Sequence, residues 1–526
     1  MSAVELIEAV VDPGSWRGWD EPVEITTADP AYRADLERAR ERTGLDESVI
    51  TGEGRIEGRR VALVACEFRF LAGSIGVAAG ERLVRAVERA TAERLPLLAA
   101  PASGGTRMQE GTVAFLQMVK VAAAITDHKA AGLPYLVHLR HPTTGGVLAS
   151  WGSLGHVTAA EPGALIGFMG PRVHQALYGA EFPPGVQVAE HLMHHGLIDA
   201  VLPASRLVGV AAQVLRVLCG GAGGDGPAVP GAAGVTAPPG TGEAPGVGGA
   251  SARTGPAPSA EESIRASRRP ERPGVRDLLR VAAEDVSPLS GTGAGEHDPG
   301  LLLALARVGG TPCVVLGHNR RSARQGEAAD GPGEGQPLGP AGLRTARRGM
   351  RLAAELGLPL LTVIDTAGAA LSREAEEGGL AGEIARCLAD MVTLPAPTLC
   401  LLLGQGAGGA ALALLPADRV VAARHAWLSP LPPEGASAIL YRTTERAYEV
   451  AERQGVRSAD LLAQGIVDRI VEEGEEGEEG EEDAAEDFLG RLGRLLGAEL
   501  ATLRAQDQEE RLAARRARHR RIGLPG

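Results

Sequence analysis

Four short glycine-containing turns are the residues of this sequence best suited to chemistry. Two lie in the first half, at Gly104–Gly105 and Gly145–Gly146, and two in the second half, at Gly368 and Gly408–Gly409. Each follows an apolar run typical of a buried strand, and we expect a helix after it. A helix N-terminus presents unpaired backbone N–H groups, and glycine allows a ligand oxygen to reach them. Two such donors that converge on a developing oxyanion would form a preorganised catalytic stabiliser.

The pattern predicts two oxyanion holes, one in each half of the chain. Such a pair suits a reaction in which two carbonyl groups must both become enolate-like. A second interpretation stays open, in which the glycines only allow tight packing of a helix on a strand.

Motifs for other kinds of catalysis are weak or absent. Gly404, Gly406 and Gly409 spell the G-x-G-x-x-G fingerprint of dinucleotide-binding turns. The next strand-like run ends at Arg424, whereas that fingerprint needs an acidic residue there to bind the ribose. No Ser-His-Asp, G-x-S-x-G or HExxH arrangement is present. Since obvious general bases are scarce, abstraction of a proton beside a carbonyl would need a base that a cofactor or substrate brings.

The two halves of the chain resemble each other, which indicates an internal duplication. LPLLAAPASGG corresponds to LPLLTVIDTAGAA, and LPYLVHLRHPTTGGVLAS to APTLCLLLGQGAGGAALAL. Three pairs of glycines keep nearly one separation, namely Gly105 and Gly368 (368 − 105 = 263), Gly145 and Gly408 (408 − 145 = 263), and Gly196 and Gly465 (465 − 196 = 269). Similar units therefore occupy about residues 45–218 and 262–472. Strands that are apolar throughout belong to sheets covered by helices, so the fold class is α/β with two tandem domains.

Three segments lie outside the repeated units. Residues 1–44 are an N-terminal extension. Residues 219–261 are mostly Gly, Ala, Pro, Ser and Thr, a composition typical of a flexible linker. Residues 473–526 are predicted to form a solvated acidic spacer, within EEGEEGEEGEEDAAED at 472–487, and then one terminal helix with a basic end.

Length, charge and apolar patterning exclude several classes of protein. A chain of 526 residues is too long for one hydrophobic core, and a net charge of −13 disfavours a nucleic-acid-binding protein. The N-terminus lacks the basic and apolar regions of a signal peptide. The apolar run at 398–416 contains Gln405 and four glycines, which predicts a buried strand, turn and helix rather than a membrane span.

Cysteine and histidine usage gives no metal-binding pattern. The five cysteines are Cys66, Cys219, Cys313, Cys387 and Cys400. None has CxxC spacing, which disfavours both a disulfide framework and a cysteine-based zinc site and suggests a reducing cytoplasm. His191, His194 and His195 cluster near a predicted helix end, where a partly exposed helix cap is the favoured interpretation over a metal site.

Long strings of both units resemble the carboxyltransferase component of bacterial acetyl-CoA carboxylase. The first unit resembles the beta subunit through FRFLAGSIGVAAGERL, ASGGTRMQEG, PTTGGVLASWGSLGHVTAAEPGALIGFMGPR and HGLIDAVLP. The second unit resembles the alpha subunit through SRRPERPGVRDLL, GHNRR, IDTAGA, GQGAGGAALAL and SPLPPEGASAIL. The chain therefore looks like a fused beta–alpha carboxyltransferase.

The resemblance implies a crotonase-like fold in each domain and transfer of a carboxyl group from carboxybiotin to acetyl-CoA or another acyl-CoA. In such enzymes one hole stabilises the thioester enolate and the other the ureido oxyanion of biotin, whose nitrogen takes the α-proton. Matching motifs assign Gly104, Gly105, Gly145 and Gly146 to the acyl-CoA side, and Gly368, Gly408 and Gly409 to the biotin side. Arg107 and Arg344 would contact CoA phosphates, and a surface or structural role for both stays equally open.

The resemblance also implies partners. Biotin carboxylase and the biotin carrier must be other chains, because no MKM attachment motif is present and the only lysines are Lys120 and Lys129. A homodimer is expected, since active sites in the family form between a beta-type and an alpha-type domain. Neither a nucleic acid nor a membrane is expected as a partner.

Departures from the family pattern leave alternatives open. No cysteine precedes Cys66, so the zinc ribbon of family beta subunits, and its zinc, are not expected. Ala367 stands where the alpha motif usually has proline, which leaves the acyl-CoA preference and the level of activity open. A biotin-independent malonate decarboxylase subunit and an inactive acyl-CoA-binding scaffold are the alternative functions.

Overall fold

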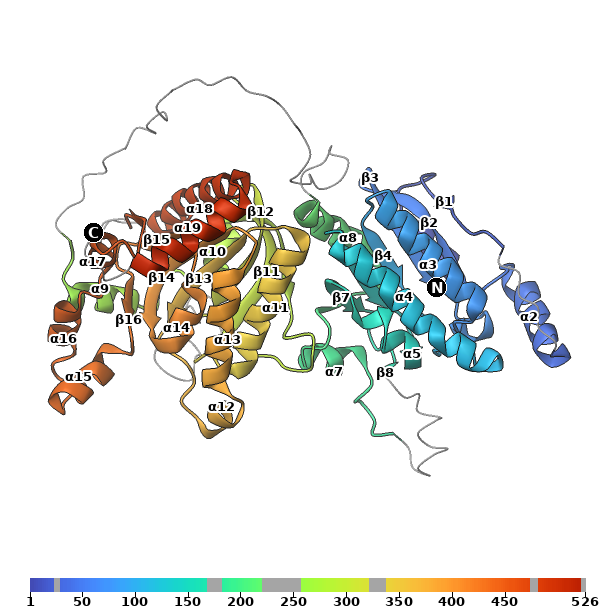
Figure 1. Cartoon of the computed structure of the whole chain (residues 1–526), viewed down its shortest axis with the longest axis horizontal. Coiled ribbons are helices and arrows are strands. Elements are labelled where there is room, and N and C mark those ends of the chain that lie inside the picture. The colour runs from blue at the N-terminus through green and yellow to red at the C-terminus, as the bar shows by residue number, and fades with distance from the viewer. Residues whose placement is uncertain (23–28, 168–181, 220–256, 321–336, 474–480, 522–526) are drawn as a thin grey trace, which may run out of the picture.

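The computed structural model describes residues 1–22, 29–167, 182–219, 257–320, 337–473 and 481–521. Two β-sheets with helices packed against them lie side by side in this part of the chain (Figure 1). The predicted α/β class with two sheet-bearing units is confirmed. The predicted linker lies almost wholly outside the described residues.

The first sheet has seven strands in the order β1-β2-β3-β4-β5-β7-β9. They are β1 (Arg17–Gly18), β2 (Val49–Ile56), β3 (Arg59–Cys66), β4 (Leu97–Ala100), β5 (Tyr135–Leu139), β7 (Val157–Ala160) and β9 (Ala200–Val201). The helices are α1 (Ala3–Val10), α2 (Pro30–Thr43), α3 (Val77–Ala92), α4 (Gly111–Ala130), α5 (Gly145–Leu148), α7 (Ala189–His194) and α8 (Ala204–Leu218). Buried apolar residues at helical spacing, such as Ala79, Leu83 and Val87, place one face of α3 on the core.

The second sheet has eight strands in the order β10-β11-β12-β13-β14-β15-β17, with β16 paired to β14. They are β10 (Ala283–Leu289), β11 (Leu301–Val308), β12 (Thr311–His318), β13 (Leu360–Thr366), β14 (Thr398–Ala407), β15 (Arg419–Ala423), β16 (Trp427–Ser429) and β17 (Arg469–Val471). The helices are α9 (Ala260–Ser267), α10 (Val275–Ala282), α11 (Pro340–Leu356), α12 (Arg373–Glu377), α13 (Leu380–Thr393), α14 (Gly408–Leu414), α15 (Pro433–Tyr441), α16 (Ala447–Gln454), α17 (Ser458–Ala463), α18 (Glu481–Ala505) and α19 (Gln508–Arg521).

The two units share one topology, as the repeated sequence pattern predicts. In each, an antiparallel hairpin (β2–β3, or β11–β12) leads into parallel strands, β3-β4-β5-β7-β9 in one unit and β12-β13-β14-β15-β17 in the other. Because neighbouring parallel strands end at the same edge of a sheet, the turns after β4 and β5 lie together, and so do those after β13 and β14. The run at 398–416 forms β14 and α14, as expected, and no helix of the described residues is long and apolar enough to cross a membrane.

A continuous interface joins the two units. α8 lies between them and packs against β10 and β11, and one hydrophobic core includes residues from both sides (Figure 1). One polar contact across this interface is made by the buried Asp199 carboxylate, which accepts two hydrogen bonds from Arg348 at 2.8 and 3.0 Å. The backbone N–H groups of Thr158 and Ser290 also donate to Asp199.

We expect Asp199→Ala to lower the free energy of unfolding by about 3–5 kcal/mol, because it leaves the Arg348 guanidinium without its buried counter-ion. Urea-induced unfolding followed by circular dichroism measures this loss. Asp468 is the counterpart of Asp199 in the second unit, accepts from Val420 N–H and pairs with Arg518, but is more exposed. Asp468→Ala should therefore cost less, and equal losses for both variants would contradict a special role of the interface.

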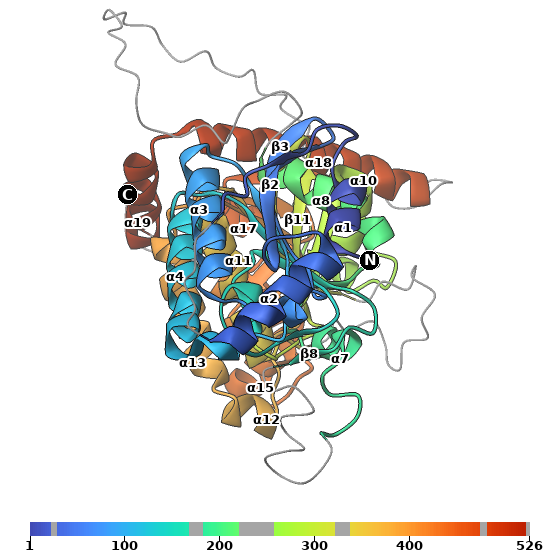
Figure 2. The same ribbon diagram turned by 90° about the vertical axis from the view of Figure 1, so that its right-hand side faces the viewer.

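The predicted boundaries need correction at both ends. The N-terminal extension is not separate from the first unit, since β1 pairs with β2, and α1 contacts α8 and β3. Seen from the end of the first unit, α2 crosses the front of the molecule (Figure 2).

The C-terminal segment also differs from the expectation. Glu473 forms an ion pair with the buried Arg272, and α18 already begins at Glu481, so the acidic run is not a solvated spacer throughout. Two helices, α18 and α19, replace the single helix expected. The basic end of α19 packs on the second unit, where Arg515 forms a bidentate pair with the buried Asp418.

Candidate active site

The first unit brings its two predicted glycine turns into direct contact. A Cβ at Gly105 would lie 3.2 Å from the nitrogen of Gly146, and a Cβ at Gly145 would lie 3.3 Å from the oxygen of Gly104. Gly105 and Gly145 both have positive φ angles, of 105° and 64°. Only glycine adopts these conformations easily while leaving the Gly146 nitrogen uncovered.

The N–H groups of the first pair of turns are not equally available. Gly104 donates to the Ala72 carbonyl oxygen at 2.9 Å, and Gly105 donates to the Ser103 hydroxyl at 3.0 Å. Gly145 and Gly146 begin α5, where the first N–H groups have no acceptor within the helix itself. Thr144, directly before them, pairs with Gly167 in the parallel β6–β8 ladder, so the Gly145 N–H lies at the end of that ladder. The candidate donors are therefore at the start of α5, where the Gly146 N–H lies outside the ladder, and a donor role for the Gly104 amide is not supported, because an ordinary backbone bond occupies it.

The second unit repeats this geometry. Gly408 and Gly409 begin α14 after the long strand β14, so their N–H groups have no acceptor within the helix itself. Ala407, directly before them, pairs with Ser429 in the β14–β16 ladder, so the Gly408 N–H lies at the end of that ladder. Gly408 has a φ of 65°, close to the value at Gly145. Gly368 has a φ of 138° and donates to the Thr366 hydroxyl at 3.1 Å, as Gly105 does to Ser103.

Two further donors were not recognised in the sequence. The N–H groups of Thr106 and Ala369, which directly follow Gly105 and Gly368, have no acceptor among the described residues. The two residues are 263 positions apart (369 − 106), the same separation as the glycines, and this repeat spacing could have revealed them. Each unit therefore presents a helix start and an adjacent turn as sources of N–H donors.

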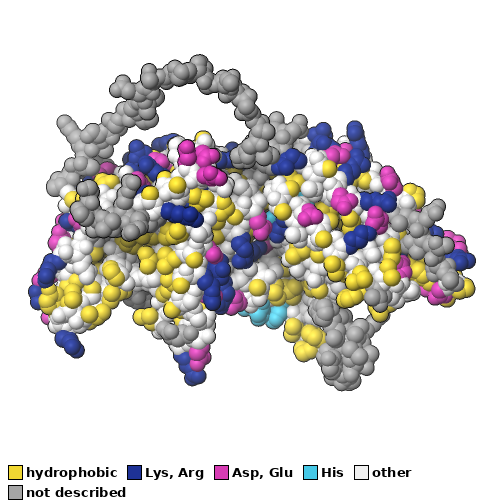
Figure 3. Space-filling view, in the orientation of Figure 1, with side chains coloured by type: hydrophobic (Ala, Val, Ile, Leu, Met, Phe, Trp, Pro, Cys, Tyr) yellow, Lys and Arg dark blue, Asp and Glu magenta, His cyan; other side chains and the backbone are white. Residues whose placement is uncertain are grey.

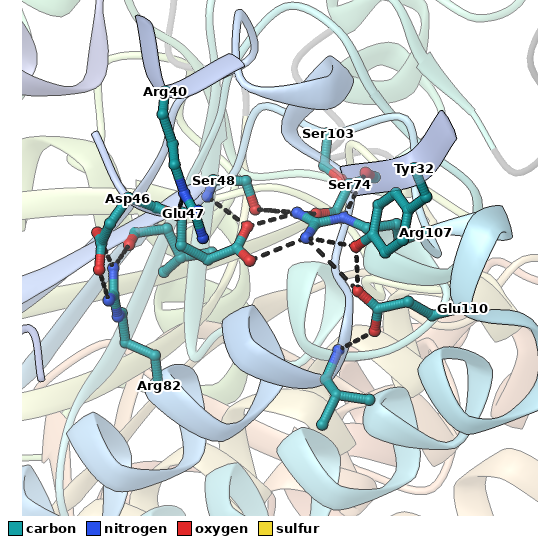
Figure 4. A network of polar contacts seen from close by, with 12 residues as sticks. Tyr32, Arg40, Asp46, Glu47, Ser48, Ser74, Arg82, Ser103, Arg107 and Glu110 are labelled. Carbon is teal, nitrogen blue, oxygen red and sulfur yellow. Dashed lines mark hydrogen bonds and ion pairs between the residues drawn. The ribbon is translucent and has the colours of Figure 1, made fainter. Parts of the chain in front are cut away.

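The prediction that Arg107 contacts a CoA phosphate is not supported by its surroundings. Its side chain is completely buried, and its guanidinium forms a bidentate pair with the buried Glu47 (Figure 4). Burial opposes the charge, but the hydrogen bonds and charge of Glu47, together with the contact with Tyr32, outweigh it and raise the pKa of Arg107. Since its donors are occupied inside the protein, Arg107 does not face a ligand.

Arg344 is partly exposed but already forms ion pairs with two carboxylates. Its guanidinium forms a bidentate pair with the Glu296 carboxylate, in which Arg344 Nε lies 2.7 Å from a Glu296 oxygen. The guanidinium also lies 3.3 Å from the Glu383 carboxylate. The Glu296 hydrogen bonds raise the pKa of Arg344. A CoA phosphate would have to compete with these groups, so the predicted contact stays a prediction.

Two carboxylates next to the second turn are held by arginines. Asp365 accepts the N–H of Gln405 and lies 3.5 Å from Arg320, with both side chains buried. Glu434 accepts two hydrogen bonds from Arg268, which lower the pKa of Glu434. Neither carboxylate is presented as a free base, in agreement with the scarcity of bases in the sequence.

The G-x-G-x-x-G string has structural reasons unrelated to a dinucleotide. Gly404 and Gly406 lie inside β14 rather than in a turn. A Cβ at Gly404 would clash with the Asp365 carboxylate, and one at Gly406 would lie 2.6 Å from the Trp427 carbonyl oxygen.

The histidine cluster lies at the end of α7. The His191 and His195 rings are 4.1 Å apart between centroids, and His194 and His195 are exposed. Among the described residues, no group of three or more His, Cys, Asp or Glu side chains is arranged to hold a metal ion.

Two protein families match the chain. Residues 1–201 match the family described as carboxyl transferase domain, and residues 258–523 match acetyl co-enzyme A carboxylase carboxyltransferase-like. The first match covers the unit that contains the seven-stranded sheet, and the second match covers the unit that contains the eight-stranded sheet.

Similar proteins are found over the whole length of the chain. A probable biotin-dependent acyl-coenzyme A carboxylase beta3 subunit of Mycobacterium tuberculosis is 58% identical over 99% of this chain and 98% of its own. The acetyl-coenzyme A carboxylase carboxyl transferase subunits beta/alpha of Parafrankia sp. is 40% identical, covering 100% of this chain and 86% of its own.

Among solved structures, the transcarboxylase 12S hexamer with methylmalonyl-coenzyme A bound has a TM-score of 0.71 at 20% identity, covering 97% of this chain and 91% of its own. A single-chain, multi-domain long-chain acyl-CoA carboxylase has a TM-score of 0.67 at 18% identity, with coverage of 94% and 46%. At these identities the similarity shows the fold alone.

Proposed function

The chain belongs to the carboxyl transferase subunits of biotin-dependent acyl-CoA carboxylases, and we propose that it transfers a carboxyl group from carboxybiotin to acetyl-CoA, giving malonyl-CoA. The observation that carries this proposal is the pair of matching helix starts, Gly145–Gly146 and Gly408–Gly409, which place two glycines at the first positions of a helix directly after a strand in both units. The first N–H groups of a helix have no acceptor within the helix. Carboxyl transfer needs two such donor sets, because negative charge develops on two carbonyl oxygens.

In the proposed mechanism, backbone amides supply most of the stabilisation. The N–H groups of Gly145 and Gly146 donate to the thioester oxygen as the acyl-CoA substrate becomes an enolate. The N–H groups of Gly408 and Gly409 would hold the ureido oxygen of the cofactor in the same way. A neutral carbonyl-type oxygen suits these donors, because they are backbone amides that carry no net charge and need no metal. When bound, carboxybiotin supplies the carboxyl group and the base for the α-proton.

We propose that two copies of the chain build each active site. Within one chain, α5 and α14 lie in different halves of the molecule, with α11 and α13 between them in the view of Figure 1. A site that uses both turns therefore needs the first unit of one copy and the second unit of another.

Exposed apolar side chains border each turn and support this arrangement. The first-unit face consists of Met108, Val113, Phe115, Leu116 and Val119, and the second-unit face of Leu371, Leu412, Ile439 and Leu440. Figure 3 shows hydrophobic side chains gathered over the region of α15 in the left half and along the lower part of α4 in the right half. Contiguous exposed apolar surface of this kind marks interaction sites. A two-fold axis that joins first-unit face to second-unit face would bring the two kinds of turn together twice.

The proposed partners are a biotin carboxylase and a biotin carrier protein. The carrier has to be another chain, because neither Lys120 nor Lys129 lies in a biotin-attachment motif. Both lysines form ion pairs within the protein, Lys120 with Glu81 and Lys129 with Glu355.

The reverse reaction tests the proposal without any partner. Purified protein, malonyl-CoA and biocytin should give acetyl-CoA at a rate that depends on biocytin. A parallel series with propionyl-CoA and longer acyl-CoA substrates plus carboxybiocytin establishes the acyl preference. Decarboxylation of malonyl groups that does not need biocytin would favour a malonate decarboxylase, and acyl-CoA binding without turnover would favour a scaffold.

A further inference from the structure

A loop at residues Leu71–Ile75, named here the holding loop, runs beside the first turn and fixes it by backbone hydrogen bonds. Gly104 donates to Ala72 O, Ile75 donates to Gly105 O, and Arg107 donates to Ile75 O, each at 2.9 Å. Leu71 and Ala72 have φ angles of 44° and 55°. Residues other than glycine adopt such left-handed conformations at a cost, so surrounding contacts must hold them there.

The Arg107 side chain supplies contacts of this kind. Its guanidinium donates to the Ser74 carbonyl oxygen at 2.8 Å and to the Ser74 hydroxyl at 3.2 Å (Figure 4). On its other side it donates to the Glu47 carboxylate at 2.8 Å and to the Ser48 hydroxyl at 3.2 Å. The planar fork of an arginine can join a carboxylate to the holding loop in this way, whereas a lysine ammonium cannot.

Tyr32 links this network to the N-terminal segment. Its hydroxyl, carried by α2, accepts from Arg107 at 3.4 Å and donates to Glu110 (Figure 4). The Glu110 carboxylate accepts the N–H of Val77 at 2.6 Å, at the start of α3. Burial raises the pKa of Tyr32 to about 12, so the hydroxyl keeps its proton at neutral pH.

We propose that Arg107 is a positioning residue that fixes the Gly104–Gly105 turn, against which the Gly145–Gly146 helix start packs, through the holding loop, and that Tyr32 of α2 supports it. Neither side chain touches the reacting atoms in this assignment. The inference rests on the proposed function, which places the thioester oxygen at the Gly145–Gly146 helix start beside this turn. A displacement of about 1 Å at such a turn can cost roughly 10²-fold in rate.

Arg107→Lys and Tyr32→Phe test this assignment in the full-length protein. Arg107→Lys should lower kcat for malonyl-CoA and biocytin by roughly 10–100-fold, and Tyr32→Phe by a smaller factor. The KM for malonyl-CoA should stay nearly unchanged in both, because the contacts that bind the substrate are kept. Hydrogen–deuterium exchange of peptides that contain residues 71–75 and 104–107 should become faster.

Arg82→Lys is the matched control. Arg82 is another buried arginine of the same unit, bound to Asp46 at 2.6 Å and to the Val49 carbonyl oxygen at 3.0 Å. Within the described part of the chain its polar contacts do not include the holding loop. The Arg82→Lys variant should lose stability but keep the wild-type kcat. A fall in kcat equal to that of Arg107→Lys would overturn the assignment. Unchanged kcat and exchange in Tyr32→Phe, which removes only one oxygen and should fold even if Arg107→Lys does not, would also overturn it. If the wild-type protein proves inactive, the proposed function fails, while the exchange of the two segments still decides whether Arg107 and Tyr32 hold the turn.

Discussion

Gly408→Val should lower the rate of carboxyl transfer by roughly 10²–10³-fold, the usual cost of losing one oxyanion donor. The left-handed backbone at Gly408 disfavours a β-branched residue. Among the described residues, only the Pro430 carbonyl oxygen, at 3.5 Å, lies near the position of a Cβ, so the side chain would project into the open space that a ligand needs to reach the helix start. Steady-state turnover of malonyl-CoA with biocytin measures the effect.

Gly357→Val is the matched control for this prediction. Gly357 ends α11 with a φ of 62° and has nothing within 4 Å of the Cβ position, so the backbone strain is the same as at Gly408. The two variants should lose similar stability, and only Gly408→Val should lose turnover. Similar activities would mean that the Gly408 turn does not meet a substrate.

Phe115→Asp should dissociate the proposed dimer and remove most of the carboxyl transfer activity. Phe115 is 62% exposed in the first-unit face, and the fold should tolerate the change because the side chain is not part of the core. A charge in the buried centre of an interface is costly when it has no partner. Sedimentation velocity and turnover on the same sample measure both effects.

Leu462→Asp provides the comparison for Phe115→Asp. Leu462 is 43% exposed on α17, outside both faces, so this variant should stay dimeric and active. A Phe115→Asp protein that sediments and turns over like the wild type would rule out this face as the interface.

Repeat spacing predicted the part of the site that depends on local structure. Apolar runs followed by glycine located the turns at Gly105, Gly145, Gly368 and Gly408, and equal separations placed them in corresponding positions of two units. The pattern works because a strand end, a positive φ angle and a helix start all follow from residues close in sequence.

The role of Arg107 could not be predicted in the same way. Its partners Glu47 and Tyr32 are 60 and 75 residues earlier in the chain, so only the tertiary fold shows that the guanidinium is buried. The occupied N–H of Gly104 depends likewise on Ala72, which belongs to a loop before α3. The sequence showed which turns could present donors but not which amides the fold already uses.

A mixture of two inactive variants tests most directly whether both turns act in one site built by two copies. Gly145→Val and Gly408→Val chains, co-expressed with different affinity tags, should form mixed dimers in which one of the two sites has both turns intact. Dimers purified through both tags should therefore recover about half of the wild-type carboxyl transfer activity, although each variant alone is nearly inactive. Mixed dimers that remain as inactive as the separate variants would contradict the account.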